Sequence, residues 1–151
     1  MEQRLTIVTL GVADVSAARS FYERMGWHAD LEVEETVFFR VGGMFLILWS
    51  RQKLAEDGGV TDGGGWGGVT LAHNVGSTDE VDAVIEQART AGALISVEPC
   101  DTFYGGYAGV FVDPDGHPWE IAFNPSLVLD ADGAIAFAST DGEGSADGAD
   151  A

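Results

Sequence analysis

The chain has 151 residues, of which 46% are hydrophobic and 10% aromatic, an ordinary composition for one globular domain. Its 25 acidic residues against 7 Lys and Arg give a net charge of −18, which disfavours nucleic acid and anionic membranes as partners. No apolar run approaches the ~20 residues of a membrane-spanning helix, and the N-terminus lacks the pattern of a secretory signal. We therefore expect a cytoplasmic protein, without an intramolecular disulfide because Cys100 is the only cysteine.

A strand followed by a helix is predicted at the start of the chain. Leu5 to Val12 is a β-branched run typical of a strand. Asp14 is a candidate N-cap, and apolar residues at helical spacing follow it until Gly26. Three extended segments are predicted next, at about residues 27–33, 36–41 and 44–50. Gly42-Gly43 is a hairpin signal between the last two.

The same order of elements is predicted a second time. Gly68 begins the run GVTLAHNV, whose Val69-Thr70-Leu71 matches Val8-Thr9-Leu10 of the first copy. Ser77 or Thr78 is the candidate N-cap of a helix that Gly92 ends. Three extended segments then follow, at about residues 94–98, 108–112 and 118–123. An internal repeat of this kind predicts two copies of one βαβββ unit within a single α+β domain.

The domain is expected to span residues 1–125, with a first module at about 4–50 and a second at about 68–125. Between them, residues 51–67 are rich in Gly and Asp, which favours an exposed linker. Two short hydrophobic runs flank an Asp-Ala-Asp-Gly turn within residues 126–137 and indicate an extra hairpin. Residues 138–151 are small and acidic, so a disordered tail is predicted there.

Two motifs in this order carry a family resemblance: LGVADVSAARSFYERMGW after the first strand, and GVFVDPDGHPWEIAFNP near the end. The chain from Leu5 to Pro125 resembles the vicinal oxygen chelate superfamily, which includes glyoxalase I, extradiol dioxygenases and bleomycin-resistance proteins. The resemblance implies that the two modules form a curved mixed sheet around a small-molecule cleft. It also implies a homodimer, because open sheet edges favour pairing with a second copy.

In metal-dependent members of this superfamily, four ligands come from the first and fourth strands of the two modules. The corresponding positions here are Ile7, Ile47, Gly68 and Glu120, and of these side chains only that of Glu120 can bind a metal. The internal repeat supports the assignment, since Ile47 and Glu120 each lie four residues after a turn glycine. We therefore expect no tightly held cofactor, while a divalent metal stays open as an alternative.

Glu120 is the candidate catalytic residue. It lies between Trp119 and Ile121 in a strand, so period-2 alternation directs it away from the hydrophobic face and toward the expected cleft. There a raised pKa would make it a general base or a hydrogen-bonding partner for a ligand, with Arg40 or Tyr107 as a neighbour. A purely structural role is an equally good interpretation.

Five aromatic residues are candidates for binding a flat ligand, because they lie near strand ends and in the loop before the seventh strand. They are Trp49, Trp66, Phe103, Tyr104 and Tyr107. Packing in the core or in a dimer interface is the alternative for each. The histidines are interpreted differently: His73 as a hydrogen-bonded structural residue, and His28 and His117 as surface residues beside turns.

Three functions are consistent with these observations. The first is a binding protein for small hydrophobic or aromatic molecules that needs no metal. The second is a lyase, isomerase or dioxygenase-like enzyme that uses Glu120 as a base or as its sole protein metal ligand. The third is a structural or partner-binding domain whose cleft is filled by side chains.

Overall fold

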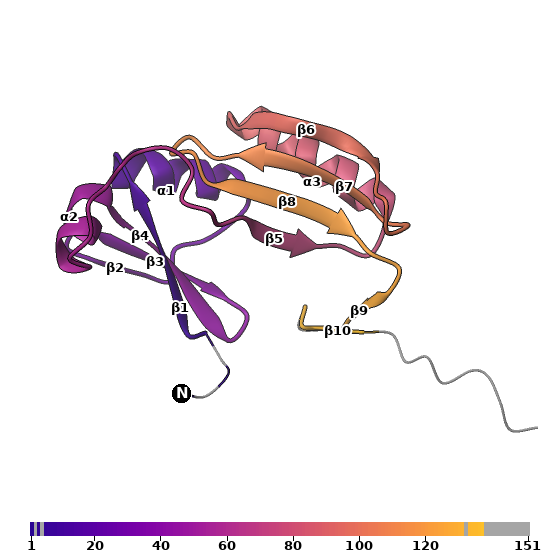
Figure 1. Ribbon diagram of the computed structural model, residues 1–151, viewed down its shortest axis with the longest axis horizontal. Coiled ribbons are helices and arrows are strands. Elements are labelled where there is room, and N and C mark those ends of the chain that lie inside the picture. Colours follow the sequence, from indigo (N-terminus) through magenta and orange to yellow (C-terminus); the bar gives the residue numbers. More distant parts are fainter. Residues whose placement is uncertain (2, 4, 132, 138–151) are drawn as a thin grey trace, which may run out of the picture.

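The computed structural model describes residues 1, 3, 5–131 and 133–137. Figure 1 shows two modules side by side, each with one four-stranded sheet and a helix packed on it. The first module contains β1 (Ile7–Val12), α1 (Val15–Arg24), β2 (Leu31–Val33), β3 (Thr36–Val41) and β4 (Met44–Ser50). The second contains β5 (Leu71–Asn74), α3 (Thr78–Ala91), β6 (Leu94–Asp101), β7 (Tyr107–Val112) and β8 (Pro118–Phe123).

The two sheets have the same topology. Their strand orders are β1-β4-β3-β2 and β5-β8-β7-β6. In each sheet the first strand pairs in parallel with the fourth, and the other neighbours are antiparallel. The predicted α+β fold of two βαβββ modules is therefore confirmed, with two separate mixed sheets in place of one continuous sheet.

The helices begin where the capping residues predict. The side chain of Asp14 accepts a hydrogen bond from the backbone N–H of Ala17 at 3.0 Å, which satisfies one free donor of α1. At α3 the cap is Ser77, one of the two predicted candidates, and its hydroxyl accepts from the N–H of Glu80. Gly92 ends α3 with φ of 102°, a left-handed conformation that favours glycine.

The segment between the modules, expected to be an exposed linker, begins with a helix. Residues Arg51–Asp57 form the helix α2, because Ser50 caps it by accepting from the N–H of Lys53 and helix-favouring residues follow. After β8 the chain forms a two-stranded hairpin of β9 (Leu127–Leu129) and β10 (Ile135–Phe137). The expected disordered tail at 138–151 lies outside the described residues. No helix in the described part of the chain could cross a membrane.

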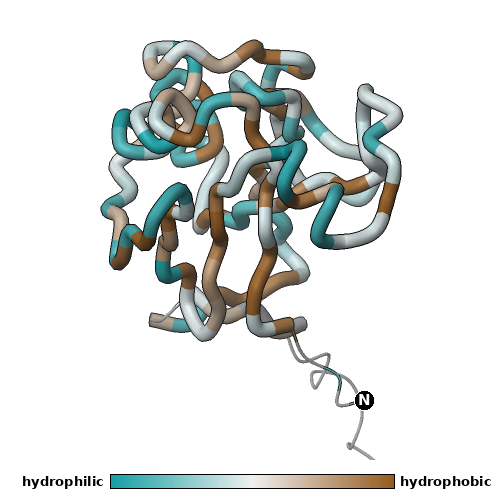
Figure 2. Tube along the Cα trace, turned by 90° about the vertical axis from the view of Figure 1, so that its left-hand side faces the viewer, coloured by the Kyte–Doolittle hydropathy of each residue, from teal (hydrophilic) through white to brown (hydrophobic). Residues whose placement is uncertain are grey.

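Both modules contribute to one hydrophobic core. Phe21 of α1 contacts Phe111 of β7, with 6.2 Å between ring centroids. Arg24 of α1 also donates to the carbonyl of Ala91 in α3 at 2.9 Å. In Figure 2 the brown, hydrophobic stretches follow the strands through the body of the molecule. Because the shared core lies on the helix-bearing faces, each sheet has an inner face toward it and an outer face away from it.

A buried polar network connects the modules at the centre of this core. The hydroxyl of Tyr22 donates to Oδ2 of Asp113 at 2.7 Å and accepts from Nε1 of Trp119 at 3.2 Å. Asp113, in the turn between β7 and β8, also accepts from the backbone N–H of Asp115 and of His117. The His117 ring lies 2.8 Å from the same carboxylate. His117, predicted as a surface residue, is thus half-buried and holds the turn.

The network shifts the pKa values of Tyr22 and Asp113 in opposite directions. Burial raises the pKa of Tyr22, and the adjacent Asp113 carboxylate raises it further. Burial also favours the neutral form of Asp113, but hydrogen bonds from His117 and Tyr22 outweigh it and hold the pKa of Asp113 below its ordinary value. The carboxylate is therefore charged in the folded protein at neutral pH.

We predict that Asp113→Asn lowers the free energy of unfolding at pH 7 by about 2 to 4 kcal/mol, because the buried donors lose a charged acceptor. Since the folded pKa of Asp113 is depressed, its stabilisation is present above the unfolded value of about 3.9 and is lost as pH falls through the folded pKa. Urea titrations of both proteins at several pH values measure this.

The exposed Asp57→Asn is the matched control, for which a change within about 0.5 kcal/mol is expected. A difference between Asp113→Asn and the unmodified protein that stays constant down to about pH 2 would contradict the assignment.

Candidate ligand-binding site

A cavity lies between the two modules, on the inner faces of both sheets. It has a large compartment of about 630 Å³ and a small one of about 100 Å³. Trp27, His73 and Trp119 line both compartments, so the two are adjacent. We call this space the inter-module cavity. The volume of the large compartment is within the range of ligand pockets.

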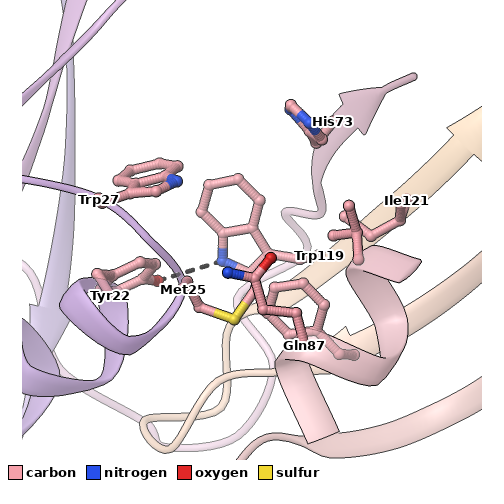
Figure 3. A pocket seen from close by; sticks show the side chains of 9 residues that line it. Tyr22, Met25, Trp27, His73, Gln87, Trp119 and Ile121 are labelled. Carbon is pink, nitrogen blue, oxygen red and sulfur yellow. Dashed lines mark hydrogen bonds between the residues drawn. The ribbon is translucent and has the colours of Figure 1, made fainter. Parts of the chain in front are cut away.

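Aromatic rings form much of the wall. The rings of Trp27 and Trp119 are perpendicular, with 5.6 Å between their centroids. Phe39 lies 5.6 Å from Trp27 on the side of the first sheet, and Tyr22 lies 5.3 Å from it on α1. Figure 3 shows Trp27 above Tyr22, with Trp119 beside them and joined to Tyr22 by a hydrogen bond. These rings provide flat apolar surface for a ligand.

Few polar groups face the cavity, and two of them have no partner among the described residues. The imidazole of His73, on β5, and the amide of Gln87, on α3, form no hydrogen bond with a described residue. Figure 3 shows the His73 ring on β5 and the Gln87 side chain on α3, and both residues line the small compartment. The prediction that His73 is a hydrogen-bonded structural histidine is therefore wrong for the described contacts.

The lining of the cavity also differs in charge from the rest of the chain. Although the chain has 25 acidic residues, none of the described residues that line either compartment is acidic. Two of the three histidines, His28 and His73, line it. Arg40 also touches the large compartment, but its guanidinium lies over the Phe45 ring and bonds Asp30 at 3.0 Å. The cavity is thus apolar, with imidazole as its main polar chemistry.

The positions implied by the family resemblance lie elsewhere. Ile47 alternates with the core residues Leu46 and Leu48, so it points to the outer face of the first sheet. Ile7 lies on the same face, about half exposed. Glu120 alternates with Trp119 and Ile121 and points to the outer face of the second sheet. None of these residues lines the inter-module cavity.

The strand register also shows that Thr70, and not Gly68, is the position in the second module that corresponds to Ile7. Val8 pairs with Leu46 and Leu71 pairs with Trp119. Because Leu46 and Trp119 are equivalent in the repeat, Leu71 corresponds to Val8, and Thr70 to Ile7. Gly68 lies two residues earlier, before β5, with φ of 79°. The Val-Thr-Leu match misaligned the copies by two residues, a shift that alternation does not detect.

Glu120 is half-buried and pairs across the sheet with Ala72 and Val110. Its expected neighbours are engaged elsewhere: Arg40 bonds Asp30, and the hydroxyl of Tyr107 donates to Asp82 at 3.0 Å. Among the described residues, no group of three or more His, Cys, Asp or Glu side chains could hold a metal ion. Glu120 is therefore a half-buried carboxylate on the outer face, without a hydrogen bond or ion pair to a described residue.

The five candidate aromatics also lie outside the inter-module cavity. Trp66 and Phe103 are exposed, and the Trp66 indole donates to the carbonyl of Val69. Phe103 and Tyr104 contact each other edge to face at 5.3 Å. Tyr107 begins β7, and Trp49 lies on the outer face of β4. The structure does not bring these five residues together.

The residues that line the cavity were missed for an identifiable reason. Trp27 follows the helix-ending Gly26, and Trp119 occupies an alternating core position, so both have the sequence pattern of core residues. A tryptophan is too large for most core sites to enclose completely. One sequence signal could have indicated a cavity. Trp27 and Trp119 are large residues that belong to different modules, so they can meet only where the two modules adjoin.

Comparisons with known proteins agree with this architecture. Residues 4–121 match the family described as the Glyoxalase/Bleomycin resistance protein/Dioxygenase superfamily. The chain belongs to this superfamily. The match confirms the resemblance seen in the two sequence motifs and covers both βαβββ modules. No curated protein matches the chain significantly.

Solved structures show the same fold. A glyoxalase-related enzyme from Fulvimarina pelagi is similar at 38% identity and a TM-score of 0.85, over 91% of this chain and 100% of that one. A glyoxalase/bleomycin resistance protein/dioxygenase from Nocardioides is 25% identical, with a TM-score of 0.68 over 82% and 84% of the two chains. A lactoylglutathione lyase from Agrobacterium tumefaciens, 20% identical over 82% and 95% of the chains, has a TM-score of 0.64 and shares the fold alone.

Proposed function

We propose that this superfamily member binds a small hydrophobic or aromatic molecule in the inter-module cavity, in the cytoplasm and without a tightly held metal. The observation that supports this most directly is the pair of tryptophans, Trp27 and Trp119, on the wall of a cavity of about 630 Å³. Flat ligands bind well against such rings, because apolar area is buried and the aromatic edges and faces attract each other.

The chemistry of the family positions supports a function without a tight metal site. Ile7 and Ile47 have aliphatic side chains, and the register gives Thr70 in place of a carboxylate or imidazole. A single carboxylate, Glu120, does not define a tight transition-metal site. Binding by ring contacts and burial needs none of these residues.

An enzyme is the second candidate, and the half-buried carboxylate of Glu120 on the outer face of the second sheet favours it. An unpaired carboxylate there could abstract a proton next to a carbonyl group, as a general base. The relative from Fulvimarina pelagi is described as a glyoxalase-related enzyme, which is consistent with catalysis in this chain. In this function Glu120 is the base or the sole protein ligand of a divalent metal.

A homodimer is proposed from the outer faces of the two sheets. On the first sheet, Ile7 and Leu31 are each about half exposed, and the apolar surface continues over Phe38 and Phe45. On the second sheet, the outer face has small alanines around Glu120. A second copy could place the apolar face against the small-residue face, with Arg40 of one copy near Glu120 of the other. Two-fold symmetry makes this contact occur twice in one dimer, which gives a closed assembly of two copies.

The binding proposal predicts that Trp27→Ala weakens the affinity for 2-naphthylmethanol, a neutral flat probe, by about tenfold, because ring contacts of about 1.5 kcal/mol are lost. Isothermal titration calorimetry measures the affinity. Trp66→Ala, which removes an exposed tryptophan outside the cavity, is the control and is expected to bind like the unmodified protein. Equal affinities for all three proteins would contradict the site.

The enzyme candidate predicts that the protein accelerates exchange of the methyl protons of pyruvate in D₂O, and that Glu120→Gln abolishes the acceleration. Proton NMR follows the exchange. The neutral amide has nearly the same shape, so loss of folding is not expected, and circular dichroism checks this. If Glu120→Gln exchanges pyruvate protons as fast as the unmodified protein, Glu120 is not the base.

The dimer proposal predicts twice the monomer mass by light scattering after size-exclusion chromatography. Ile7→Glu should produce a monomer, because it puts a charge into the apolar contact. Val60→Glu changes another exposed aliphatic residue, one that lies outside both sheets, and should leave the dimer intact. A monomeric unmodified protein, or a dimer unaffected by Ile7→Glu, would rule out this interface.

A further inference from the structure

We infer that the ligand of the inter-module cavity is a planar aromatic carboxylate, with its ring against Trp27 and Trp119 and its carboxylate on the imidazole of His73. This inference rests on the proposed function, which requires an apolar ligand but does not specify its polar group. The class of ligand follows from three observations on the lining of the cavity.

The first observation is the placement of His73. It lines both compartments, together with Trp27 and Trp119. On β5 it pairs with Ile121 of the adjacent strand, so its side chain has the same inner-face orientation as that core residue. A ligand bound against the two tryptophans would therefore have the His73 imidazole in the same compartment, within the lining.

The second observation is that polar groups here have free capacity. His73 and Gln87 are solvent-exposed and form no hydrogen bond with a described residue, so each could exchange water for a bound molecule. The other main polar group of the small compartment, the Tyr22 hydroxyl, is saturated because it donates to Asp113 and accepts from Trp119. His73 and Gln87 both line the small compartment, and each can donate a hydrogen bond to an acceptor group of a ligand there.

The third observation is electrostatic. Among the described residues, no acidic side chain lines either compartment, although acidic residues outnumber Lys and Arg by 25 to 7 in the chain. By contrast, three surface hollows elsewhere on the molecule are lined by residues such as Glu56, Glu32 and Glu86. An anion bound in the cavity would therefore meet donors, with no carboxylate among the described lining residues.

The geometry also excludes a different anion-binding residue. Arg40 touches the large compartment, but its guanidinium lies 4.7 Å from the centre of the Phe45 ring and bonds Asp30. His28 lines the large compartment alone. His73 is the imidazole that lines both compartments together with the two tryptophans, and specificity for the carboxylate depends on it.

The test compares 2-naphthoate with 2-naphthylmethanol, which has the same ring system and no charge. Isothermal titration calorimetry at physiological salt should show that the unmodified protein binds naphthoate about tenfold more tightly, as one charge-assisted hydrogen bond predicts. His73→Leu should remove this preference while the affinity for the alcohol is kept. His73→Gln, which keeps a donor, should restore part of it.

Asn74→Leu is the matched control, because Asn74 is the next residue of β5 and lines neither compartment. It should keep the full preference for naphthoate. Equal binding of the two probes, or a preference unchanged in His73→Leu, would overturn the carboxylate inference and leave the proposed binding function intact. Absence of binding for both probes would contradict the inference and the proposed site together.

Discussion

The hydrogen bond between Tyr22 and Asp113 is the interaction on which the arrangement of the two modules depends. It joins α1 of the first module to the β7–β8 turn of the second, 91 residues apart in sequence. Because both partners are buried, removal of either leaves an unsatisfied polar group in a low-dielectric core, which costs more than the bond itself contributes. Apolar packing brings the modules together, and this bond specifies how they are oriented.

That orientation is also what forms the cavity. Trp119 donates to the Tyr22 hydroxyl, so its indole is held at a fixed angle at the boundary between the modules. Trp27 follows α1 directly and contacts both Tyr22 and Trp119. Rings that are held by a hydrogen bond and by one another cannot collapse into the space beside them. A cavity of this size therefore persists next to a well-packed core.

The sequence predicted the fold well because local signals and the internal repeat agree. Asp14, Ser77 and Gly92 mark helix ends through backbone hydrogen bonds and a left-handed turn, which depend on near neighbours. The site was harder to predict, since it depends on which side chains from different modules meet. His117 was interpreted as a surface residue because its sequence position beside a turn does not reveal its contact with Asp113. That contact depends on the tertiary fold, in which Tyr22 from the other module binds the same carboxylate.

Strand alternation explains why the family positions and the cavity are separate. Along β8, Trp119 and Ile121 face the shared core, whereas Glu120 between them faces outward. A change of residue at Glu120 therefore alters the outer face without disturbing the tryptophan wall, and the reverse also holds. One strand can thus serve two surfaces whose chemistry differs: an isolated carboxylate on one, and aromatic rings beside an imidazole on the other. In such a fold, loss of metal ligands on the outer faces leaves the capacity for binding on the inner faces unchanged.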